Sequence, residues 1–420
     1  MTYPLSTSSR WIVDENGQRA KLMSCGGERT KQAKQPVDAV AKKIVEMSFN
    51  CVRLTWPSDL MTNETLAYNV TVRQSFQSFG LNDDIVGFKT NNPSIIDLSL
   101  IEAFICVTEV NVTFRTHNTR DLCLAFFLFC SKSNDVMVIL DNHLTKPGWC
   151  CADNDGNDFS GDKFFDPTVW AAALSKMTAT FDGVSNVVGM SLRNELTGPK
   201  QNVNDWFKYM QQGAEAVHSA NKNVLVILSG LTFDTDLSFV RCLPVNLSFT
   251  GKLVFELHWY SFSSKPERNS GGFLLNQGFP LFLSEFGMDK REINANDDRY
   301  FGCLTGWTAE NDVDWSIWAL TGSYILNTSV RKSSFLEKIS LLQSTLQGPG
   351  PRTDDYNLVL DPLTRLCLSS GPENLVKMTR TGCSGPGSKW QTDSASRMHL
   401  SSTTSNKLHF ALMWTQPTMS

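Results

Sequence analysis

The sequence lacks several features that assign a chain to a particular class of partner. It has no long run of like charges, and its 42 acidic and 38 basic residues leave a formal net charge of −4. This balance gives no reason to expect a nucleic acid or an anionic membrane as a partner. One strongly apolar window, residues 122–130, is much shorter than the roughly 20 residues of a spanning helix, so no membrane segment is predicted.

Motifs that bind cofactors or metals are also missing. No phosphate-binding loop or dinucleotide fingerprint follows a predicted strand, and no G-x-S-x-G nucleophile motif occurs. His143 stands near the adjacent Cys150 and Cys151, but zinc sites pair their cysteines across gaps of two to four residues. The sequence therefore predicts neither a cofactor nor a metal site.

The N-terminal stretch MTYPLSTSSRW has no basic region followed by an apolar one, so the chain as written carries no signal peptide. Eleven cysteines are many for a cytosolic enzyme, and five N-glycosylation sequons begin at Asn63, Asn69, Asn111, Asn246 and Asn327. These features suit an extracellular protein. Either the protein is intracellular, or its true N-terminus is missing from this chain.

The strongest structural signal is a series of eight apolar, strand-like runs. A turn at Asn16-Gly17 predicts a hairpin over 11–25 that leads into the first of them. Helical patterns separate most of the runs, and this alternation predicts an α/β fold, the (β/α)8 TIM barrel. The runs are 20–25, 50–56, 136–143, 187–196, 224–230, 252–260, 280–287 and 313–320.

Helices are predicted where apolar residues recur at helical spacing or where capping residues occur. Asp166 is expected to cap a helix that has Pro167 at its first position. A long polar excursion is expected after residue 56. The predicted helices are 36–49, 94–105, 166–181, 202–221 and 333–343.

The composition shifts after the predicted barrel, which is placed at 11–345. Residues 346–354 hold a Gly-Pro linker, and 355–420 are rich in Ser, Thr and Gly with short strand-like pieces. We therefore expect a small β appendage at the C-terminal end of the chain.

Two of the apolar runs end in carboxylates, which predicts a particular chemistry. The run VVGMSLRNEL ends in Asn194 and Glu195, and PLFLSEFG carries Glu285. Catalytic residues of barrel enzymes lie at strand ends of this kind. Two carboxylates there indicate glycoside hydrolysis, in which one acts as proton donor and the other as nucleophile or base.

The polar and aromatic residues at the strand ends resemble, in type and order, the active site of glycoside hydrolase family 5, the cellulase family. The resemblance spans roughly 50 to 320. The segments LDNHLTKPGWCC, SLRNELTGP and LHWYSF are similar to sequences of the plant secreted branch of that family, whose members carry a ricin-type lectin domain C-terminal to the barrel. The matching residues are Arg53, His143, Asn194, Glu195, His258, Tyr260, Glu285 and Trp318.

The resemblance implies a retaining mechanism, and the chemistry of the residues fits it. Glu285 would attack the anomeric carbon, and Glu195 would protonate the leaving oxygen and later deprotonate water. Arg53 and Tyr260 are candidates to hold Glu285 charged and oriented. Asn194 would bind the sugar 2-hydroxyl.

Aromatic residues are expected to bind the sugar rings. Trp318 would stack on the sugar at the cleavage point, and Trp56 and Trp149 are expected to extend the cleft. Trp259 should point away from the site, because side chains alternate along a strand and His258 and Tyr260 take the other face.

Several segments depart from the family pattern. The connection after the first strand and the segments after Tyr260 and Tyr324 are short, and residues 106–132 look foreign to the resemblance. The tail resembles one repeat and a fragment of a ricin-type β-trefoil, with Cys367 and Cys383 as its bridge, so it is expected to be incomplete.

The predicted function is a hydrolase of β-linked glucans or β-glucosides, with a carbohydrate as the partner. Two alternatives stay open at this point. One is a catalytically impaired carbohydrate-binding pseudo-enzyme, and the other is a hydrolase directed at β-mannan or a glycolipid.

Overall fold

A computed structural model describes residues 1–27, 35–110, 136–147, 150–152, 155–261, 271–287 and 295–319. The predicted helix at 333–343, the linker at 346–354 and the appendage at 355–420 lie outside the described residues, as do Trp149 and residues 111–132 of the foreign segment. Within the described part of the chain, no helix is long and apolar enough to cross a membrane.

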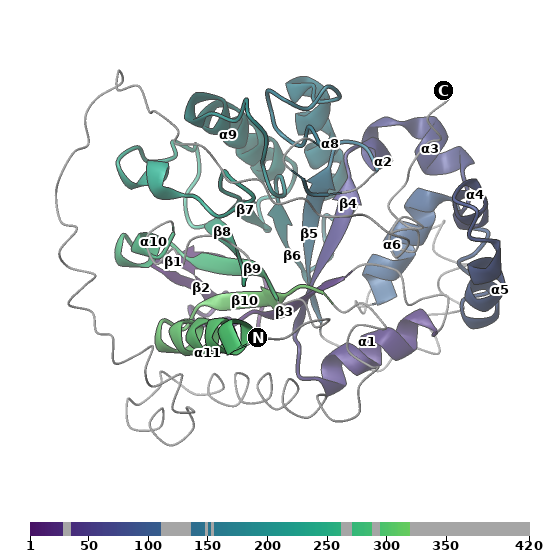
Figure 1. Cartoon of the computed structure of the whole chain (residues 1–420), viewed down its shortest axis with the longest axis horizontal. Coiled ribbons are helices and arrows are strands. Elements are labelled where there is room, and N and C mark those ends of the chain that lie inside the picture. Colours follow the sequence, from purple (N-terminus) through teal and green to yellow (C-terminus); the bar gives the residue numbers. More distant parts are fainter. Residues whose placement is uncertain are drawn as a thin grey trace.

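Eight parallel strands close into a barrel in the order β10-β3-β4-β5-β6-β7-β8-β9 (Figure 1). Each overlaps one of the apolar runs in the sequence, so the predicted (β/α)8 barrel is confirmed. Fully buried parallel strands give continuous apolar runs because both of their faces are covered. The strands are β3 (Met23–Gly27), β4 (Cys51–Pro57), β5 (Met137–Leu144), β6 (Val187–Ser191), β7 (Leu225–Leu228), β8 (Leu253–Tyr260), β9 (Leu281–Gly287) and β10 (Asp314–Ile317).

Several helices cover the outside of the barrel (Figure 1). They are α1 (Val37–Glu46), α6 (Leu100–Val110), α8 (Pro167–Thr180), α9 (Val203–Ala220) and α11 (Ala295–Glu310). The predicted cap of α8 is confirmed, because the Asp166 carboxylate accepts from the backbone N–H groups of Thr168 and Val169. Asn202 caps α9 in the same way through Asp205 N–H.

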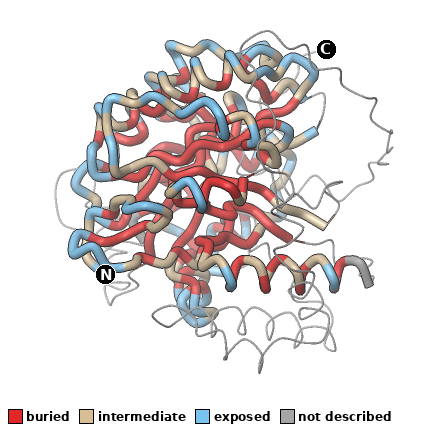
Figure 2. Tube along the Cα trace, turned by 90° about the vertical axis from the view of Figure 1, so that its left-hand side faces the viewer, coloured by how far each residue is buried: buried red, intermediate tan, exposed pale blue. Residues whose placement is uncertain are grey.

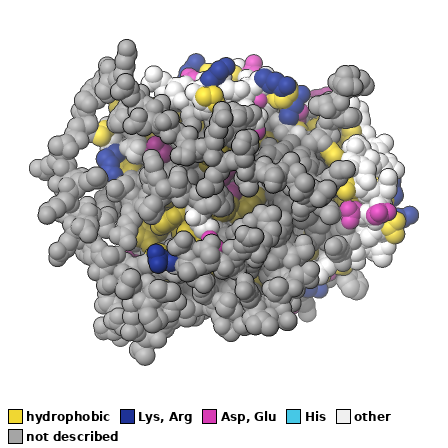
Figure 3. Space-filling model, in the orientation of Figure 1, with side chains coloured by type: hydrophobic (Ala, Val, Ile, Leu, Met, Phe, Trp, Pro, Cys, Tyr) yellow, Lys and Arg dark blue, Asp and Glu magenta, His cyan; other side chains and the backbone are white. Residues whose placement is uncertain are grey.

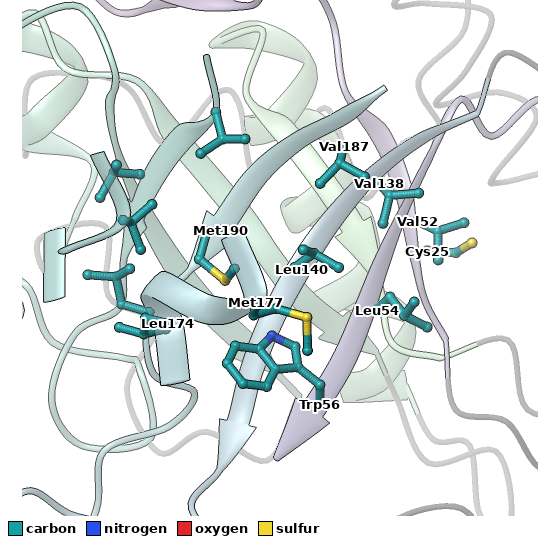
Figure 4. Close-up of a cluster of buried hydrophobic side chains, with 14 of the residues drawn as sticks. Cys25, Val52, Leu54, Trp56, Val138, Leu140, Leu174, Met177, Val187 and Met190 are labelled. Atoms are coloured by element: carbon teal, nitrogen blue, oxygen red, sulfur yellow. The ribbon is translucent and has the colours of Figure 1, made fainter. Parts of the chain in front are cut away.

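The main core lies between the strands and the surrounding helices, where Figure 2 shows the buried residues concentrated. Trp56 of β4 packs there with Leu140 of β5 and Met177 of α8 (Figure 4). Trp259 also points outward, as predicted, and its ring contacts Tyr300 and Trp307 of α11. The helices are therefore fixed on the barrel by large aromatic side chains.

The stretch after β4 is not the polar excursion that the sequence predicts. It forms four short helices, and each buries only one to three residues: α2 (Asp59–Thr62), α3 (Glu64–Asn69), α4 (Val72–Ser78) and α5 (Asn82–Asn91). Few buried positions per helix leave too short a pattern to recognise in the sequence. Short segments η2 (Ser238–Arg241) and α10 (Phe273–Asn276) complete the described helices.

The predicted N-terminal hairpin is present only in part. Gly17 has φ +74° at the expected turn, and a short ladder crosses it: Val13 pairs with Arg19, Asp14 N–H donates to the Gln18 carbonyl and Ala20 N–H donates to the Ile12 carbonyl. The antiparallel partner of β2 (Trp11–Val13) is instead the preceding β1 (Ser6–Ser8). The predicted turn is therefore confirmed, with a short antiparallel pairing behind it, while the regular strand pairing of β2 is with β1.

Candidate active site

All eight residues predicted for the site lie at the C-terminal end of the barrel or just below it, and each contacts at least one other member of the set. Among the described residues, every barrel strand except β3 supplies a polar or aromatic side chain to this end, either directly or through the residues that follow it. In the space-filling view, acidic and hydrophobic side chains are both visible near the middle of the molecule (Figure 3).

Arg53 of β4 lies at the centre of the site and is completely buried. Its Nη1 is 2.6 Å from Oε1 of Glu285, and its Nη2 donates to Oδ1 of Asn194 at 2.9 Å. Nη2 also lies 3.1 Å from Oδ1 of Asp141 and 3.7 Å from Oε2 of Glu256. One guanidinium therefore holds side chains from four other strands or strand ends in a single arrangement.

Glu195 follows the end of β6 in a backbone conformation that side chains other than glycine seldom adopt, with φ +37°. The Asn157 side chain stabilises this turn by donating to the carbonyls of Asn194 and Glu195, at 3.1 and 3.2 Å. The Asn194 N–H donates to the Asn142 carbonyl of β5 at 3.0 Å. These contacts point the Asn194 and Glu195 side chains into the site.

Two adjacent cysteines lie beside Asn194. Cys150 and Cys151 are joined as a disulfide, and their sulfurs are 3.5 and 3.6 Å from Asn194 Nδ2. Their position next to the catalytic candidates gives the sulfurs a packing role at the edge of the site.

The two candidate catalytic glutamates face each other across His258. The Glu195 Oε1 atom is 2.8 Å from Nδ1 of His258, and Oε2 of Glu285 is 3.7 Å from the same nitrogen. A carboxylate oxygen of Glu195 lies within 4.8 Å of one of Glu285. The Tyr260 hydroxyl donates to Oε2 of Glu285 at 2.7 Å.

His143 and Trp318 form an aromatic pair on the other side of the site. Their rings are stacked, with centroids 5.5 Å apart and planes 8° apart. Nδ1 of His143 is 2.7 Å from Asp141, and its Nε2 is 3.4 Å from the Asn194 amide nitrogen. The Trp318 ring also packs on the backbone of Gly26, where a Cβ atom would overlap it.

The environments of the two glutamates differ in ways that assign them different tasks. Burial and the charge of Glu285 raise the pKa of Glu195 well above its ordinary value. Burial also raises the pKa of Glu285, but Arg53 and the Tyr260 hydroxyl oppose that increase. The carboxyl with fewer donors keeps its proton, and the one held by Arg53 and Tyr260 ionises more readily.

Exposure separates the residues that can meet a ligand from those that support them. Glu195 has 14% of its side chain exposed, and Tyr260 and Trp318 are also partly exposed. Arg53 is fully enclosed, and Asn194 and Glu285 expose only a few per cent of their surface. The site is open at the acid side and closed beneath the nucleophile candidate.

Three buried carboxyl groups around Arg53 and His258 were not predicted from the sequence: Asp141, Asp234 and Glu256. Two of them could have been found from the alternation of side chains along a strand. Asp141 stands two residues before His143 on β5, and Glu256 two before His258 on β8, so each shares a face with a predicted residue. Asp234 lies in the loop after β7, where no periodic pattern applies.

The predicted role of Trp56 in extending the cleft is wrong. Trp56 is three positions after Arg53 on β4, so its side chain points to the opposite face, and it is fully buried against α8. The other proposed cleft residue, Trp149, lies outside the described residues.

Comparisons with known proteins identify the family. The family model for cellulase, glycosyl hydrolase family 5, matches residues 127–323. A glycosyl hydrolase 5 family protein from Chamaecyparis obtusa is 37% identical over 443 residues, which cover 93% of this chain and 75% of the relative.

Solved structures share the fold. The catalytic domain of the major endoglucanase of Xanthomonas campestris pv. campestris has a TM-score of 0.58 and 20% identity, covering 82% of this chain and all of that one. The endocellulase of the archaeon Pyrococcus horikoshii has a TM-score of 0.57 and 15% identity, covering 82% of this chain and 98% of the other. On the relative and the family match together, this chain belongs to glycosyl hydrolase family 5.

Proposed function

We propose that this chain cleaves β-linked glucans or β-glucosides with retention of configuration. Glu285 is the nucleophile and Glu195 the acid and base. The observation that carries the proposal is the close approach of the two glutamates, whose carboxylate oxygens come within 4.8 Å of each other. Retaining enzymes hold their two carboxyl groups about 5 to 5.5 Å apart, whereas inverting enzymes leave about 6.5 to 9.5 Å for a water.

The first step breaks the glycosidic bond. An ionised Glu285, held by Arg53 and Tyr260, attacks the anomeric carbon while Glu195 gives its proton to the departing oxygen. A glycosyl ester on Glu285 and an ionised Glu195 result. The raised pKa of Glu195 fits a group that must hold a proton before this step.

The second step hydrolyses the ester. Water enters where the leaving group was, Glu195 takes its proton, and the oxygen attacks the anomeric carbon to release Glu285. The Asn194 amide accepts from Arg53, which also holds Glu285, and is placed to bind the sugar 2-hydroxyl, while Trp318 offers a ring face on which the sugar can stack.

The substrate is inferred from the solved enzymes that share this fold. The endocellulase of Pyrococcus horikoshii and the endoglucanase of Xanthomonas campestris share the barrel, and a complex of the former with cellotetraose has been solved. A β-1,4-linked glucan is therefore the first substrate to test. The absence of charge runs in the chain also fits a neutral polysaccharide.

The 37% identical relative from the plant Chamaecyparis obtusa supports placing the chain in the plant branch of the family. From that placement we infer an extracellular location and a C-terminal tail that is an incomplete lectin-type domain without lectin activity. Secretion of the native protein from plant cells tests the first inference, and failure of the full chain to bind a galactose matrix tests the second.

Turnover of a panel of aryl β-glycosides tests the proposed function, with glucoside, cellobioside and mannoside members and with leaving groups of different acidity. Glu285→Ala should abolish turnover of every member. Glu195→Ala should lose most activity on a poor leaving group and much less on dinitrophenyl glycosides, which depart without a proton. Proton NMR should show the β-anomer of the sugar as the first product.

A folded parent that binds cello-oligosaccharides without releasing product supports the pseudo-enzyme alternative instead. Faster turnover of the mannoside than of the glucoside would redirect the substrate to β-mannan and leave the catalytic assignment intact.

A further inference from the structure

Asp234 is a buried carboxyl group that the mechanism above does not use. It lies in the loop after β7 with φ +55°, and its side chain is fully enclosed. One oxygen, Oδ1, accepts from the backbone N–H of Gly230, and its backbone carbonyl accepts from the N–H of His258 at 2.9 Å. Asp234 is therefore fixed beside His258 from two directions.

Two polar atoms without hydrogen-bond partners face each other at this point. Oδ2 of Asp234 is 3.5 Å from Nε2 of His258, and each is buried with no partner of normal geometry among the described residues. Buried polar atoms are nearly always hydrogen-bonded, and hydrogen bonds in a ligand-free active site are often long. A proton between these two atoms satisfies both.

The proton can sit on either atom, and the surroundings decide which. Among the described residues, no cation forms an ion pair with Asp234, because the guanidinium of Arg53 contacts Asp141, Glu285 and the Asn194 amide and acts on Asp234 only through its charge. Burial and the neighbouring charge of Glu256 raise the pKa of Asp234 well above its ordinary value. Burial and the positive charge of Arg53 lower the pKa of His258 well below its ordinary value. A carboxylic acid beside a neutral imidazole results.

We propose that Asp234 is a positioning residue for the reaction: its carboxylic acid donates to Nε2 of His258, which keeps the imidazole proton on Nδ1, where it points at Glu195. This inference rests on the proposed function, because it assigns Glu195 as the acid and base. The tautomer of a histidine is set by the hydrogen bond that its other nitrogen makes.

The tautomer matters for Glu195. With a proton on Nδ1, His258 donates to Oε1 at 2.8 Å and stabilises the carboxylate that forms when Glu195 protonates the leaving group. With the proton on Nε2 instead, the unprotonated Nδ1 would accept a hydrogen bond from the Glu195 carboxylic acid. Glu195 would then hold its proton more tightly. The first tautomer makes Glu195 a stronger acid, and Asp234 selects it.

Other charged groups around His258 do not replace this contact. The titratable side chains that face it are Arg53, His143, Glu195, Asp234, Glu256 and Glu285. Oε2 of Glu256 also lacks a hydrogen-bond partner, but it lies 3.7 Å from the guanidinium of Arg53. The partnerless Oδ2 of Asp234 lies 3.5 Å from Nε2 of His258. We therefore assign the expected effect on the alkaline limb of kcat/KM to Asp234 acting through His258.

Two substitutions at Asp234 separate its donor from its charge. Asp234→Ala removes the donor to Nε2. Asp234→Asn keeps a neutral donor there and keeps an oxygen for Gly230. Asp236→Asn is the matched control, since Asp236 lies in the same loop and its carboxylate accepts from Ser238 N–H instead.

The pH dependence of kcat/KM on an aryl β-glucoside is the measurement. For Asp234→Ala we expect the alkaline limb to move up by about half to one pH unit. We also expect the maximum to fall about tenfold, as for other residues that orient a histidine. Asp234→Asn and Asp236→Asn should keep the parent's limb. A purely structural role would lower thermal stability and leave the limb in place, and an equal shift in Asp234→Asn would mean that Asp234 acts as an anion; either result overturns the proposal.

Imidazole ¹⁵N NMR of the parent gives a test that needs no folded variant at Asp234. The chain has six histidines, and His258 is assigned by the signal that His258→Asn removes. We expect a neutral ring protonated on Nδ1, unchanged between pH 5 and 8. An Nε2–H ring, or loss of activity on chelation that places a cation between Asp234 and His258, contradicts the proposal. A parent that shows the expected tautomer and hydrolyses no glycoside contradicts the proposed function and leaves the hydrogen bond standing.

Discussion

The guanidinium of Arg53 and the carboxylate of Glu285 lie 2.6 Å apart, and both side chains are almost completely enclosed by the barrel. An ion pair in that setting loses the hydration of both groups, so it is stable only when further hydrogen bonds surround it. Asn194, Asp141 and the Tyr260 hydroxyl supply them. The nucleophile candidate is thus held ionised by a network rather than by one contact.

Arg53→Lys should lower kcat by roughly 100-fold or more, the usual cost of losing a fixed donor in an active site. A lysine has one ammonium group, which cannot reach Glu285, Asn194 and Asp141 in the geometry of the planar guanidinium. Steady-state kinetics on an aryl β-glucoside would show the loss in kcat with a smaller change in KM.

The control for this change is Arg193→Lys. Arg193 is equally buried and also donates to a carboxylate, at 2.8 Å to Asp162, but it does not contact either glutamate. It should lose stability and keep its activity within a few-fold of the parent. Equal losses of kcat in the two variants would mean that Arg53 acts by supporting the fold.

Tyr260→Phe removes one hydrogen bond to Glu285 and keeps the ring. The Tyr260 hydroxyl lowers the pKa of Glu285, so its removal raises that pKa. Because the nucleophile must be ionised, the acid limb of kcat/KM should move to higher pH by about half to one unit. Tyr300→Phe is the control, since the Tyr300 hydroxyl donates to the Trp259 carbonyl outside the site. An acid limb that stays in place in Tyr260→Phe would exclude this role.

The barrel could be predicted from the sequence because its strands are buried on both faces. Residues 224–230 are a continuous apolar run, and the structure has β7 there, enclosed by strands and by α9. The eight site residues could be located because they stand at the ends of such runs. Parallel strands bring their C-terminal ends together, so the order of the chain already places these residues side by side.

What could not be predicted depends on contacts between distant segments. The role proposed for Asp234 depends on its contact with Nε2 of His258, 24 positions further along the chain. Asp234 lies in a loop, and a loop has no residue periodicity from which this contact could be predicted. Trp56 is a different case. It lies an odd number of positions from Arg53 on one strand, so alternation alone should have placed it in the core.

Gly26→Ala should disturb the sugar-binding face without touching a catalytic group. A Cβ atom at Gly26 would overlap the Trp318 ring, which stacks on His143. We expect KM for a cello-oligosaccharide to rise several-fold because the ring must tilt. Gly271→Ala is the control, because the atoms nearest to its Cβ would be those of Leu237 and Leu257, at ordinary contact distances of 3.6 Å. An unchanged KM in Gly26→Ala would show that the Trp318 ring is not part of the binding face.

Glu256→Gln should change how stability depends on pH. Burial raises the pKa of Glu256 from 4.5 to about 7. Because this folded-state pKa lies above the unfolded value, the protonated form favours folding. That contribution is complete below pH 4.5 and is lost as the pH rises through 7. Glutamine mimics the protonated acid and carries no such loss.

Urea unfolding of Glu256→Gln and of the parent at pH 5 and pH 8 measures this effect. The free energy of unfolding of the variant minus that of the parent should be more positive at pH 8 than at pH 5, which means a relatively more stable variant, by up to about 3 kcal/mol, the value of a shift of this size. Glu310→Gln, at the exposed end of α11, is the control, and its free energy of unfolding should change between pH 5 and pH 8 as that of the parent does. If the free energy of unfolding of Glu256→Gln changes with pH as that of the parent does, Glu256 is ionised throughout this range. Arg53 would then neutralise Glu256 as well as Glu285, and the guanidinium would hold the nucleophile less tightly than its 2.6 Å contact implies.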